Sequence, residues 1–307
     1  MTDAIVVLGA GGFIGRHVCR AMARLGHVVH GVGHGCWRGR GWCEWGMDSW
    51  TEGDITLSTL AAAAPTPPVA FIHCAGSGSV AFSYQNPLDD FFRSVDTTAT
   101  LLDHIRTACD GRSRAVLTSS AAVYGEQGDV DLVESDVCAP MSPYGVHKLA
   151  AEGLGRSYSR FFDVPVSVVR LFSVYGEGLR KQLLWDAAHK FRRGDPRFFG
   201  TGSEVRDWIH VEDAADLLCA AALGDQEPFE VYNGGHAAAS TRNVLTTLAT
   251  HFPGQPQPVF TGETHTGNPR RLTGDSGHAR RNLGWTPRIQ LGDGLQRYHA
   301  WFAGLEF

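Results

Sequence analysis

The chain has 307 residues, of which 43% are hydrophobic and 19% charged, an ordinary balance for a water-soluble enzyme of one or two domains. Its formal net charge of -5 implies no basic face, which excludes nucleic acid as an expected partner. No apolar run approaches the ~20 residues of a membrane span, and the N-terminus lacks the pattern of a signal peptide. We therefore expect a cytoplasmic protein with no membrane segment.

The seven cysteines are scattered and form no CxxC pair, which indicates reduced thiols rather than disulfides or zinc ligands. The nearest pair, Cys36 and Cys43, has no further Cys or His at ligand spacing. We predict no metal site.

The first elements of the chain predict a dinucleotide site. Residues 4–8, AIVVL, are typical of a buried strand in a parallel sheet. Three glycines follow at G-x-x-G-x-x-G spacing, then a helical pattern and a second strand over residues 27–32. Glycine permits a positive φ and a close approach to a pyrophosphate, and the helix N-terminus offers free N–H groups. A plain tight turn is the alternative to a cofactor site formed by Gly9, Gly12, Phe13, Ile14 and Gly15.

The end of the second strand bears on which dinucleotide binds. An acidic residue usually stands about 20 residues after the glycines and binds the ribose hydroxyls of NAD. Gly33 stands there instead, and His34, Arg38 and Arg40 follow it. These side chains suit the 2′-phosphate of NADP, so the sequence favours NADP, with NAD possible. The alternative is that the arginines are solvated and either cofactor is accepted.

Four of the eight tryptophans lie in residues 36–50, beside the expected adenine pocket. They predict a local hydrophobic plug rather than an aromatic lid over the adenine. Asp54, in EGDIT, stands where a third strand should end and could accept a hydrogen bond from the adenine amino group. Its neighbour Ile55 belongs to the same predicted contact. The tryptophans are Trp37, Trp42, Trp45 and Trp50.

Two further buried strands, residues 69–75 and 115–119, lead to the candidate catalytic residues. Tyr144 and Lys148 are four residues apart, which places them on one face of a helix. A phenol of pKa ~10 is a poor base near neutrality, and a nearby ammonium would stabilise the phenolate. Tyr144 could then exchange a proton with a substrate hydroxyl or carbonyl. Ser120, at the carboxyl end of its strand, could hold the same oxygen.

These motifs resemble the extended short-chain dehydrogenases/reductases, in the NAD-dependent epimerase/dehydratase family that acts on nucleotide sugars. The matches follow the family's order over almost the full length: GAGGFIG, IHCAG, SSAAVYG, SPYGVHK, RLFSVYG, FGTGSEVRDWIHVEDAADLL, VYNGG and NLGWTP. The resemblance implies a catalytic triad of Ser120, Tyr144 and Lys148. It also implies a nucleotide-diphosphate sugar as substrate, with Arg206 on the diphosphate.

The resemblance places further residues around the cofactor and the substrate. Cys74, Ala75 and Gly76 would contact the cofactor. Residues 76–98 are especially similar to the UDP-galactose 4-epimerases, without gaps, and Ser79 in this stretch would contact the substrate.

Several positions depart from the family pattern. Ser94 replaces the usual Asn of N-V-x-G-T, so the relay that this Asn supports is not expected in its usual form. Ser173 replaces the substrate-site Asn of R-x-F-N. Near the C-terminus, where an Arg and a Gly-Asp pair usually grip the ribose, the chain has His265 and residues 267–268, Gly-Asn. The substitutes we expect are Arg270 or Arg271.

The residues after Ser120 narrow the reaction that the resemblance implies. The chain has Ala121 and Ala122 where 4,6-dehydratases carry Asp-Glu, decarboxylating relatives Glu, and 3,5-epimerase/reductases Cys. Those reactions lack their acid and base. What remains is hydride transfer at one sugar carbon, expected to be C4. Gly33 slightly favours a 4-ketoreductase that uses NADPH, whereas residues 76–98 favour the alternative, a 4-epimerase that retains NAD. A non-catalytic NAD(P)-binding protein is least favoured, because all three triad residues are present.

The pattern predicts an α/β fold, a Rossmann-type doubly wound parallel sheet with a smaller C-terminal α/β substrate domain. We expect residues 1–172, joined by about 208–232, to form the first domain, and residues 173–207 and 233–307 the second. Lys181 and Gln182 begin the second domain and could touch phosphate. His210, His236 and His278 are expected to be structural or solvated.

Two helices predict an assembly. The helix over residues 87–107 and the Tyr144 helix carry more apolar surface than a one-sided stripe needs. The resemblance implies that they pair with their symmetry mates in a four-helix bundle, so we expect a C2 homodimer.

Overall fold

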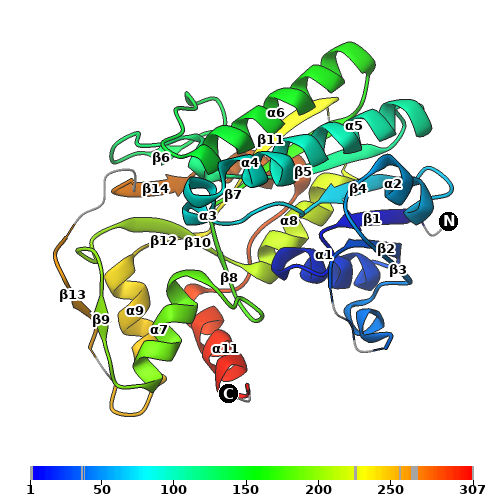
Figure 1. Ribbon diagram of the computed structural model, residues 1–307. Coiled ribbons are helices and arrows are strands. Elements are labelled where there is room, and N and C mark those ends of the chain that lie inside the picture. Colours follow the sequence, from blue (N-terminus) through cyan, green and yellow to red (C-terminus); the bar gives the residue numbers. More distant parts are fainter. Residues whose placement is uncertain are drawn as a thin grey trace.

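The computed structural model describes residues 3–35, 37, 39–224, 227–255, 257–263 and 269–305. Seven parallel strands form the central sheet, in the order β11-β7-β5-β4-β1-β2-β3 (Figure 1). This confirms the expected Rossmann-type sheet. Its strands are β1 (Ala4–Leu8), β2 (Val28–Gly33), β3 (Ser49–Glu52), β4 (Ala70–His73), β5 (Arg114–Ser120), β7 (Val166–Leu171) and β11 (Phe229–Gly234).

Helices cover both faces of this sheet, which is why its inner strands read as continuous apolar runs. On one face lie α1 (Phe13–Arg24) and α8 (Val211–Leu223). On the other lie α2 (Leu57–Ala63), α5 (Thr97–Ala108) and α6 (Pro143–Phe162). Figure 1 shows α4 (Pro87–Phe91), α5 and α6 together on the upper side of the sheet. Each face therefore encloses its own hydrophobic core.

A second, mixed sheet runs in the order β12-β10-β14-β6, and β8 pairs with β10. Beside it, α7, α9 and α11 form a separate lobe with its own apolar core (Figure 1). The strands are β6 (Asp131–Leu132), β8 (Ser173–Tyr175), β10 (Val205–His210), β12 (Ala237–Ser240) and β14 (Arg271–Gly274), and the helices are α7 (Gln182–Arg192), α9 (Thr241–Ala249) and α11 (Leu291–Ala303).

The remaining described elements are short. They are η1 (Gly41–Trp45), α3 (Val80–Gln85), η2 (Phe92–Asp96), η3 (Ala121–Val123), β9 (Arg197–Phe198), β13 (Val259–Phe260) and α10 (Gly277–Leu283). After the second sheet has begun, α8 packs on the central sheet and β11 joins it. Conversely, β6 lies in the first half of the sequence but belongs to the second sheet. The division into two domains stays a prediction.

The helix that carries Tyr144 begins and ends at residues suited to those positions. The Ser142 hydroxyl accepts a hydrogen bond from the Gly145 N–H at 3.2 Å, and Pro143 occupies the first helical position. The helix ends at Asp163, which adopts a left-handed conformation with φ of 55°. Local sequence therefore determines where this helix starts, and with it the position of Tyr144.

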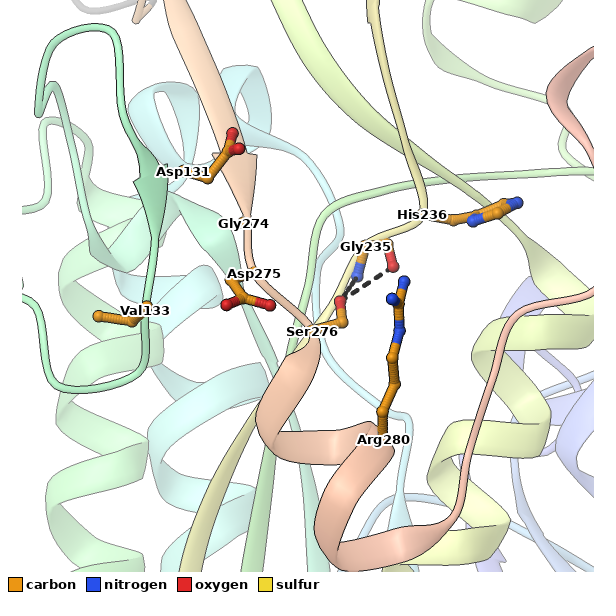
Figure 2. Close-up of a pocket in the computed structure, with 8 residues that line it drawn as sticks. All are labelled: Asp131, Val133, Gly235, His236, Gly274, Asp275, Ser276 and Arg280. Atoms are coloured by element: carbon orange, nitrogen blue, oxygen red, sulfur yellow. Dashed lines mark hydrogen bonds between the residues drawn. The ribbon is translucent and has the colours of Figure 1, made fainter.

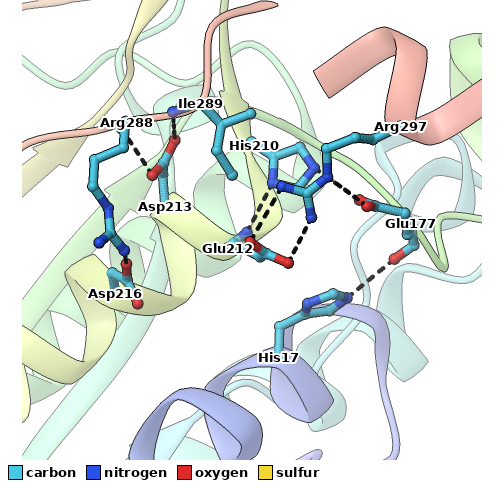
Figure 3. A network of polar contacts seen from close by, with 9 residues as sticks. All are labelled: His17, Glu177, His210, Glu212, Asp213, Asp216, Arg288, Ile289 and Arg297. Atoms are coloured by element: carbon cyan, nitrogen blue, oxygen red, sulfur yellow. Dashed lines mark hydrogen bonds and ion pairs between the residues drawn. The ribbon is translucent and has the colours of Figure 1, made fainter. Parts of the chain in front are cut away.

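A partly buried network of charges joins the two lobes around Glu177 (Figure 3). The Glu177 carboxylate lies 2.8 Å from both His210 Nε2 and Arg297 Nε, and its carbonyl oxygen lies 3.0 Å from His17 Nε2. Arg297 also pairs with Glu212 at 2.6 Å. These residues come from α1, the β8–α7 loop, the end of β10, α8 and α11. The network therefore connects the glycine-turn helix to the C-terminal helix.

Replacing Glu177 by Gln is expected to destabilise the fold in a pH-dependent way. Hydrogen bonds from His210 and Arg297 overcome the effect of burial and lower the pKa of Glu177 to about 2. Because the folded-state pKa is depressed, this stabilisation is complete above the ordinary value of 4.5 and is lost as the pH falls toward 2. The variant should lose about 3 kcal/mol at pH 7 and about 1 kcal/mol at pH 3.

Urea unfolding of both proteins at the two pH values measures this difference. Glu44→Gln, on the exposed η1 segment, is the control and should show no pH-dependent gap. An equal loss at both pH values would contradict the assigned role of the Glu177 charge.

The described ranges hold no helix that is both long and apolar enough to cross a membrane. In the same ranges, no three His, Cys, Asp or Glu side chains gather in a way that could hold a metal ion.

Candidate active site

The glycine turn between β1 and α1 is packed so closely that side chains would not fit. Gly9 has φ of 75°, and a Cβ there would lie 2.7 Å from the Ala75 backbone. A Cβ on Gly15 would lie 2.2 Å from the Gly9 carbonyl oxygen. Phe13 and Ile14 begin α1 directly after the turn. The turn thus places the N-terminus of a 12-residue helix at the carboxyl edge of the sheet, where a pyrophosphate could bind.

Arg16, on α1, contacts this turn, and the sequence analysis missed it. Its guanidinium donates to the Gly11 carbonyl at 2.6 Å and to the Gly12 carbonyl at 3.2 Å. It also lies over the rings of Trp37 and Trp45, at 5.7 and 5.0 Å from their centroids. Its position next to the third glycine of the motif was the available signal.

The end of β2 differs from what the sequence predicts for a phosphate site. His34 Nε2 lies 2.8 Å from Asp54 Oδ1, so these two side chains, expected on opposite ends of the adenosine, pair with each other. The Arg40 guanidinium lies over the Trp42 ring at 5.1 Å. Arg38 lies outside the described residues. Gly33 ends β2 beside Gly9, and a Cβ there would lie 3.4 Å from the Gly9 Cα.

The tryptophan-rich segment packs against the core next to α1. All four tryptophans are partly buried against the cluster that includes Val18 and Met22. Trp37 and Trp50 meet edge to face at 5.5 Å. This packing is that of the expected hydrophobic plug. Asp54 and Ile55 follow β3, and Ile55 packs on the core of the opposite face.

The three predicted catalytic residues converge where β5 ends and α6 begins. Ser120 is the last residue of β5, and its hydroxyl bonds to the Tyr144 phenol. Lys148 lies one turn along α6, with its ammonium 5.9 Å from the centre of the Tyr144 ring. The ammonium donates to the Thr118 carbonyl at 2.9 Å, which holds it against β5.

Burial dominates the protonation behaviour of this group. It raises the pKa of the Tyr144 phenol, and the Ser120 hydrogen bond opposes that rise. Burial also lowers the pKa of Lys148, and the Asp90 carboxylate opposes it. Both charged forms are therefore costly without a partner, and an oxyanion beside an ammonium would satisfy both.

Asp90 and His147 are further residues of this site that the sequence analysis missed. Asp90 is fully buried on α4, its carboxylate accepts a hydrogen bond from Ser77, and it lies 2.6 Å from His147 Nδ1. The Tyr144 N–H donates to Ser83 Oγ at 3.0 Å. An acidic residue within an apolar helix was the available signal, but the packing of α4 on α6 brings the pair together.

The residues that follow β4 form one wall of the site. Cys74 Sγ is 3.8 Å from Thr118 Oγ1, and Ala75 contacts the glycine turn. Gly76 passes Lys148 so closely that a Cβ there would lie 3.7 Å from its ammonium. Ser79 caps α3, accepting from the Phe82 N–H at 3.2 Å.

The other substrate-side predictions lie on the second sheet. Ser173 begins β8 and pairs with Trp208 of β10. Arg206, on β10, is partly buried, and its guanidinium donates to the Val205 carbonyl at 2.7 Å. Arg271, one of the two residues expected to substitute for the family's ribose-binding Arg, pairs with Asp131 at 2.7 Å. The other is Arg270. His265 and residues 267–268 lie outside the described ranges.

Ser94 lies directly behind Lys148. A small void of about 10 Å³ is lined by His73, Ser94, Lys148 and Glu152, among others. The Ser94 hydroxyl has no hydrogen-bond partner among the described residues. The shorter side chain thus leaves a polar gap at the position of the usual Asn.

A larger cavity of about 280 Å³ lies elsewhere, between the second sheet and α10 (Figure 2). The Asp207 carboxylate connects two of the segments that line this cavity. It accepts hydrogen bonds from the His236 N–H at 2.6 Å and from the Gly274 N–H at 3.2 Å. None of the three predicted catalytic residues lines it, so it is separate from the Tyr144 site. Its lining residues are Asp131, Val133, Gly235, His236, Gly274, Asp275, Ser276 and Arg280.

Two of the three histidines expected to be structural are paired with glutamates. His210 is fully buried against Glu177, and His278 lies 2.9 Å from Glu230.

The sequence matches the model of the NAD dependent epimerase/dehydratase family over residues 5–235. The UDP-glucose 4-epimerase of Azospirillum brasilense is 29% identical, over 95% of this chain and 90% of the relative. The UDP-glucose 4-epimerase of Rhizobium leguminosarum bv. trifolii is 28% identical, over 98% of both chains. Among solved structures, MoeE5 in complex with UDP-glucuronic acid and NAD is 29% identical, with a TM-score of 0.85 over 98% of this chain and 99% of that one.

A UDP-glucuronic acid 4-epimerase from Bacillus cereus, 24% identical, has the same fold, with a TM-score of 0.85 over 98% of this chain and 99% of that one. The family model covers most of the chain, and the glycine turn and the Ser120–Tyr144–Lys148 group lie within the matched range. These findings confirm the resemblance of the motifs. The chain belongs to the NAD dependent epimerase/dehydratase family.

Proposed function

We propose that this protein is a UDP-sugar 4-epimerase that retains NAD between turnovers. The observation that carries the proposal is the convergence of Tyr144 with Ser120 and Lys148 at the carboxyl edge of the sheet, beside the glycine turn. The names of the curated relatives support 4-epimerisation, and MoeE5 has been solved with UDP-glucose and with UDP-glucuronic acid. They favour the epimerase alternative over the ketoreductase that the sequence slightly favoured.

The geometry suits proton transfer at one sugar oxygen. Ser120 would hold the C4 oxygen by a hydrogen bond, and Tyr144 would take the hydroxyl proton as the carbon is oxidised. Lys148 would stabilise the resulting phenolate. Bound NAD would accept the hydride from C4 and return it to the opposite face of the turned ketosugar. Tyr144 would then return the proton to the oxygen.

The cofactor would lie along the glycine turn, because α1 begins directly after it and the glycines place no side chain between the backbone and a pyrophosphate. Gly9, Gly12 and Gly15 would border the pyrophosphate, and Cys74, Ala75 and Gly76 the nicotinamide side. Two side chains expected to bind a 2′-phosphate have other partners. His34 pairs with Asp54, and Arg40 stacks on Trp42. These contacts support NAD rather than NADP.

The test begins with protein purified without added cofactor. Denaturation and mass spectrometry should release stoichiometric NAD, and UDP-glucose or UDP-glucuronate should be converted to its 4-epimer without added dinucleotide. One observation favours a 4-ketoreductase instead, namely that Gly33 removes the carboxylate that usually binds the ribose of NAD. A protein that emerges empty and binds NADPH more tightly than NADH would overturn the epimerase and support the reductase.

We further propose the C2 homodimer, formed through α4, α5 and α6. Leu88 and Phe161 on these helices are 66% and 67% exposed, and Phe92 and Phe162 lie beside them on the same segments. Burial of such a surface against a second copy would stabilise a dimer. Light scattering at micromolar concentration should give the mass of two chains.

Replacing Leu88 by Glu is expected to shift this protein to monomers, because a charge would be buried in the interface. The matched control is Leu25→Glu, since Leu25 is 59% exposed at the end of α1, on the opposite face of the sheet. A monomeric parent protein, or an equal effect of both substitutions, would contradict the interface.

A further inference from the structure

The segment of residues 176–182 runs from the charge network to the catalytic wall. At its start, Glu177 is held by His210 and Arg297. In the middle, Gly178 passes the glycine turn, since a Cβ there would lie 3.6 Å from a ring carbon of Phe13. At its end, the Gln182 side chain donates to the Gly78 carbonyl at 2.9 Å. The segment is thus fixed to the protein at both ends.

Lys181 lies on the wall formed by residues 76–79. A Cβ on Gly78 would lie 3.0 Å from the Lys181 ammonium, just as one on Gly76 would lie 3.7 Å from the Lys148 ammonium. The two ammonium groups therefore contact positions two residues apart on one loop. This places Lys181 near Lys148, along the same loop of the site.

The Lys181 ammonium has no carboxylate and no hydrogen-bond acceptor among the described residues. By contrast, Lys190, in the adjoining helix, lies 2.9 Å from Asp186. Burial lowers the pKa of Lys181, and no neighbouring carboxylate offsets that effect. The side chain as a whole is exposed, so its unpaired ammonium is accessible to an anion that binds beside residues 76–79.

We propose that Lys181 binds an anionic oxygen of the substrate and so determines which UDP-sugars the site accepts. This inference rests on the proposed function, because it places the substrate on the Tyr144 side of residues 76–79. Two parts of such a substrate carry the required charge, the diphosphate and, in a hexuronate, the carboxylate on the sugar.

Binding to the intact holoprotein separates these sources. Isothermal titration of the parent protein and of Lys181→Met with UDP, UDP-glucose and UDP-glucuronate measures the three Kd values without any turnover assay. If Lys181 contacts the diphosphate, Kd should rise about tenfold for all three ligands. If it contacts the sugar carboxylate, Kd should rise about tenfold for UDP-glucuronate alone. Lys181→Arg should restore most of the lost affinity in either case.

Lys190→Met is the matched control, because it removes the same charge from a lysine that already has a partner. Unchanged Kd values for all three ligands with Lys181→Met, or an equal rise with Lys190→Met, would overturn the inference. A parent protein that holds NAD but binds none of the three ligands would instead overturn the proposed function.

Discussion

Replacing Tyr144 by Phe is expected to lower kcat about 10³-fold while leaving the bound cofactor and the fold in place. The phenol is the only group among the described residues that combines a titratable proton with a position between Ser120 and Lys148. Its removal leaves the oxygen of the substrate without a proton acceptor. Because Ser120 is the hydrogen-bond partner of the phenol among the described residues, the loss of the hydroxyl should cost little stability.

The measurement is the rate of 4-epimer formation together with the NAD content and the thermal midpoint of each protein. The matched control is Tyr84→Phe. Tyr84 is exposed on the neighbouring α3, and its hydroxyl donates to the Met141 carbonyl at 3.0 Å. Its kcat should stay within about threefold of the parent value. If the Tyr144→Phe protein kept the parent rate, Tyr144 would not take part in proton transfer. The result would then favour the alternative of a non-catalytic NAD(P)-binding protein.

Replacing Arg170 by Leu is expected to destabilise the fold by about 3–5 kcal/mol. Arg170 and Glu152 form a buried ion pair at 2.8 Å, with side chains 5% and 7% exposed. Arg170 also donates to the Tyr124 hydroxyl at 2.9 Å, and Glu152 accepts from the Ser119 hydroxyl at 2.5 Å. The single variant therefore leaves a buried carboxylate without its counter-ion.

The double variant Glu152→Leu with Arg170→Leu should recover part of this loss, because no buried charge then remains unpaired. Urea unfolding of the single and double variants measures both effects. Arg112→Leu is the control, since its pair with Asp110 is exposed and should contribute less than about 1 kcal/mol. A single variant within about 1 kcal/mol of the parent protein would contradict the assigned cost of the unpaired charge.

The parts of the site that could be predicted from sequence are those that local spacing determines. The glycine turn follows one strand and begins one helix, and Tyr144 and Lys148 are one turn apart on α6. Ser120 follows from the end of a buried strand. Each of these relations holds within a few residues, so the sequence carries it directly.

The parts that were missed depend on elements far apart in the sequence. Asp90 and His147 meet because α4 packs on α6, and His34 meets Asp54 because β2 and β3 are neighbours. The expected preference for NADP is not confirmed, and a count of cations after β2 does not show that Arg40 stacks on Trp42. The long-range pairing of side chains has no local signature in the sequence.

The strand order has a consequence for synthesis of the protein on the ribosome. The edge strand β11 ends at Gly234, yet its neighbour β7 ends at Leu171, and β8 and β10 of the second sheet lie between them in the chain. While the nascent chain grows over that interval, β7 presents an uncovered edge of N–H and C=O groups that another chain could join. Stalling or cleavage between these strands should therefore yield aggregates rather than a soluble N-terminal fragment, although residues 1–172 contain the glycine turn and all three predicted catalytic residues.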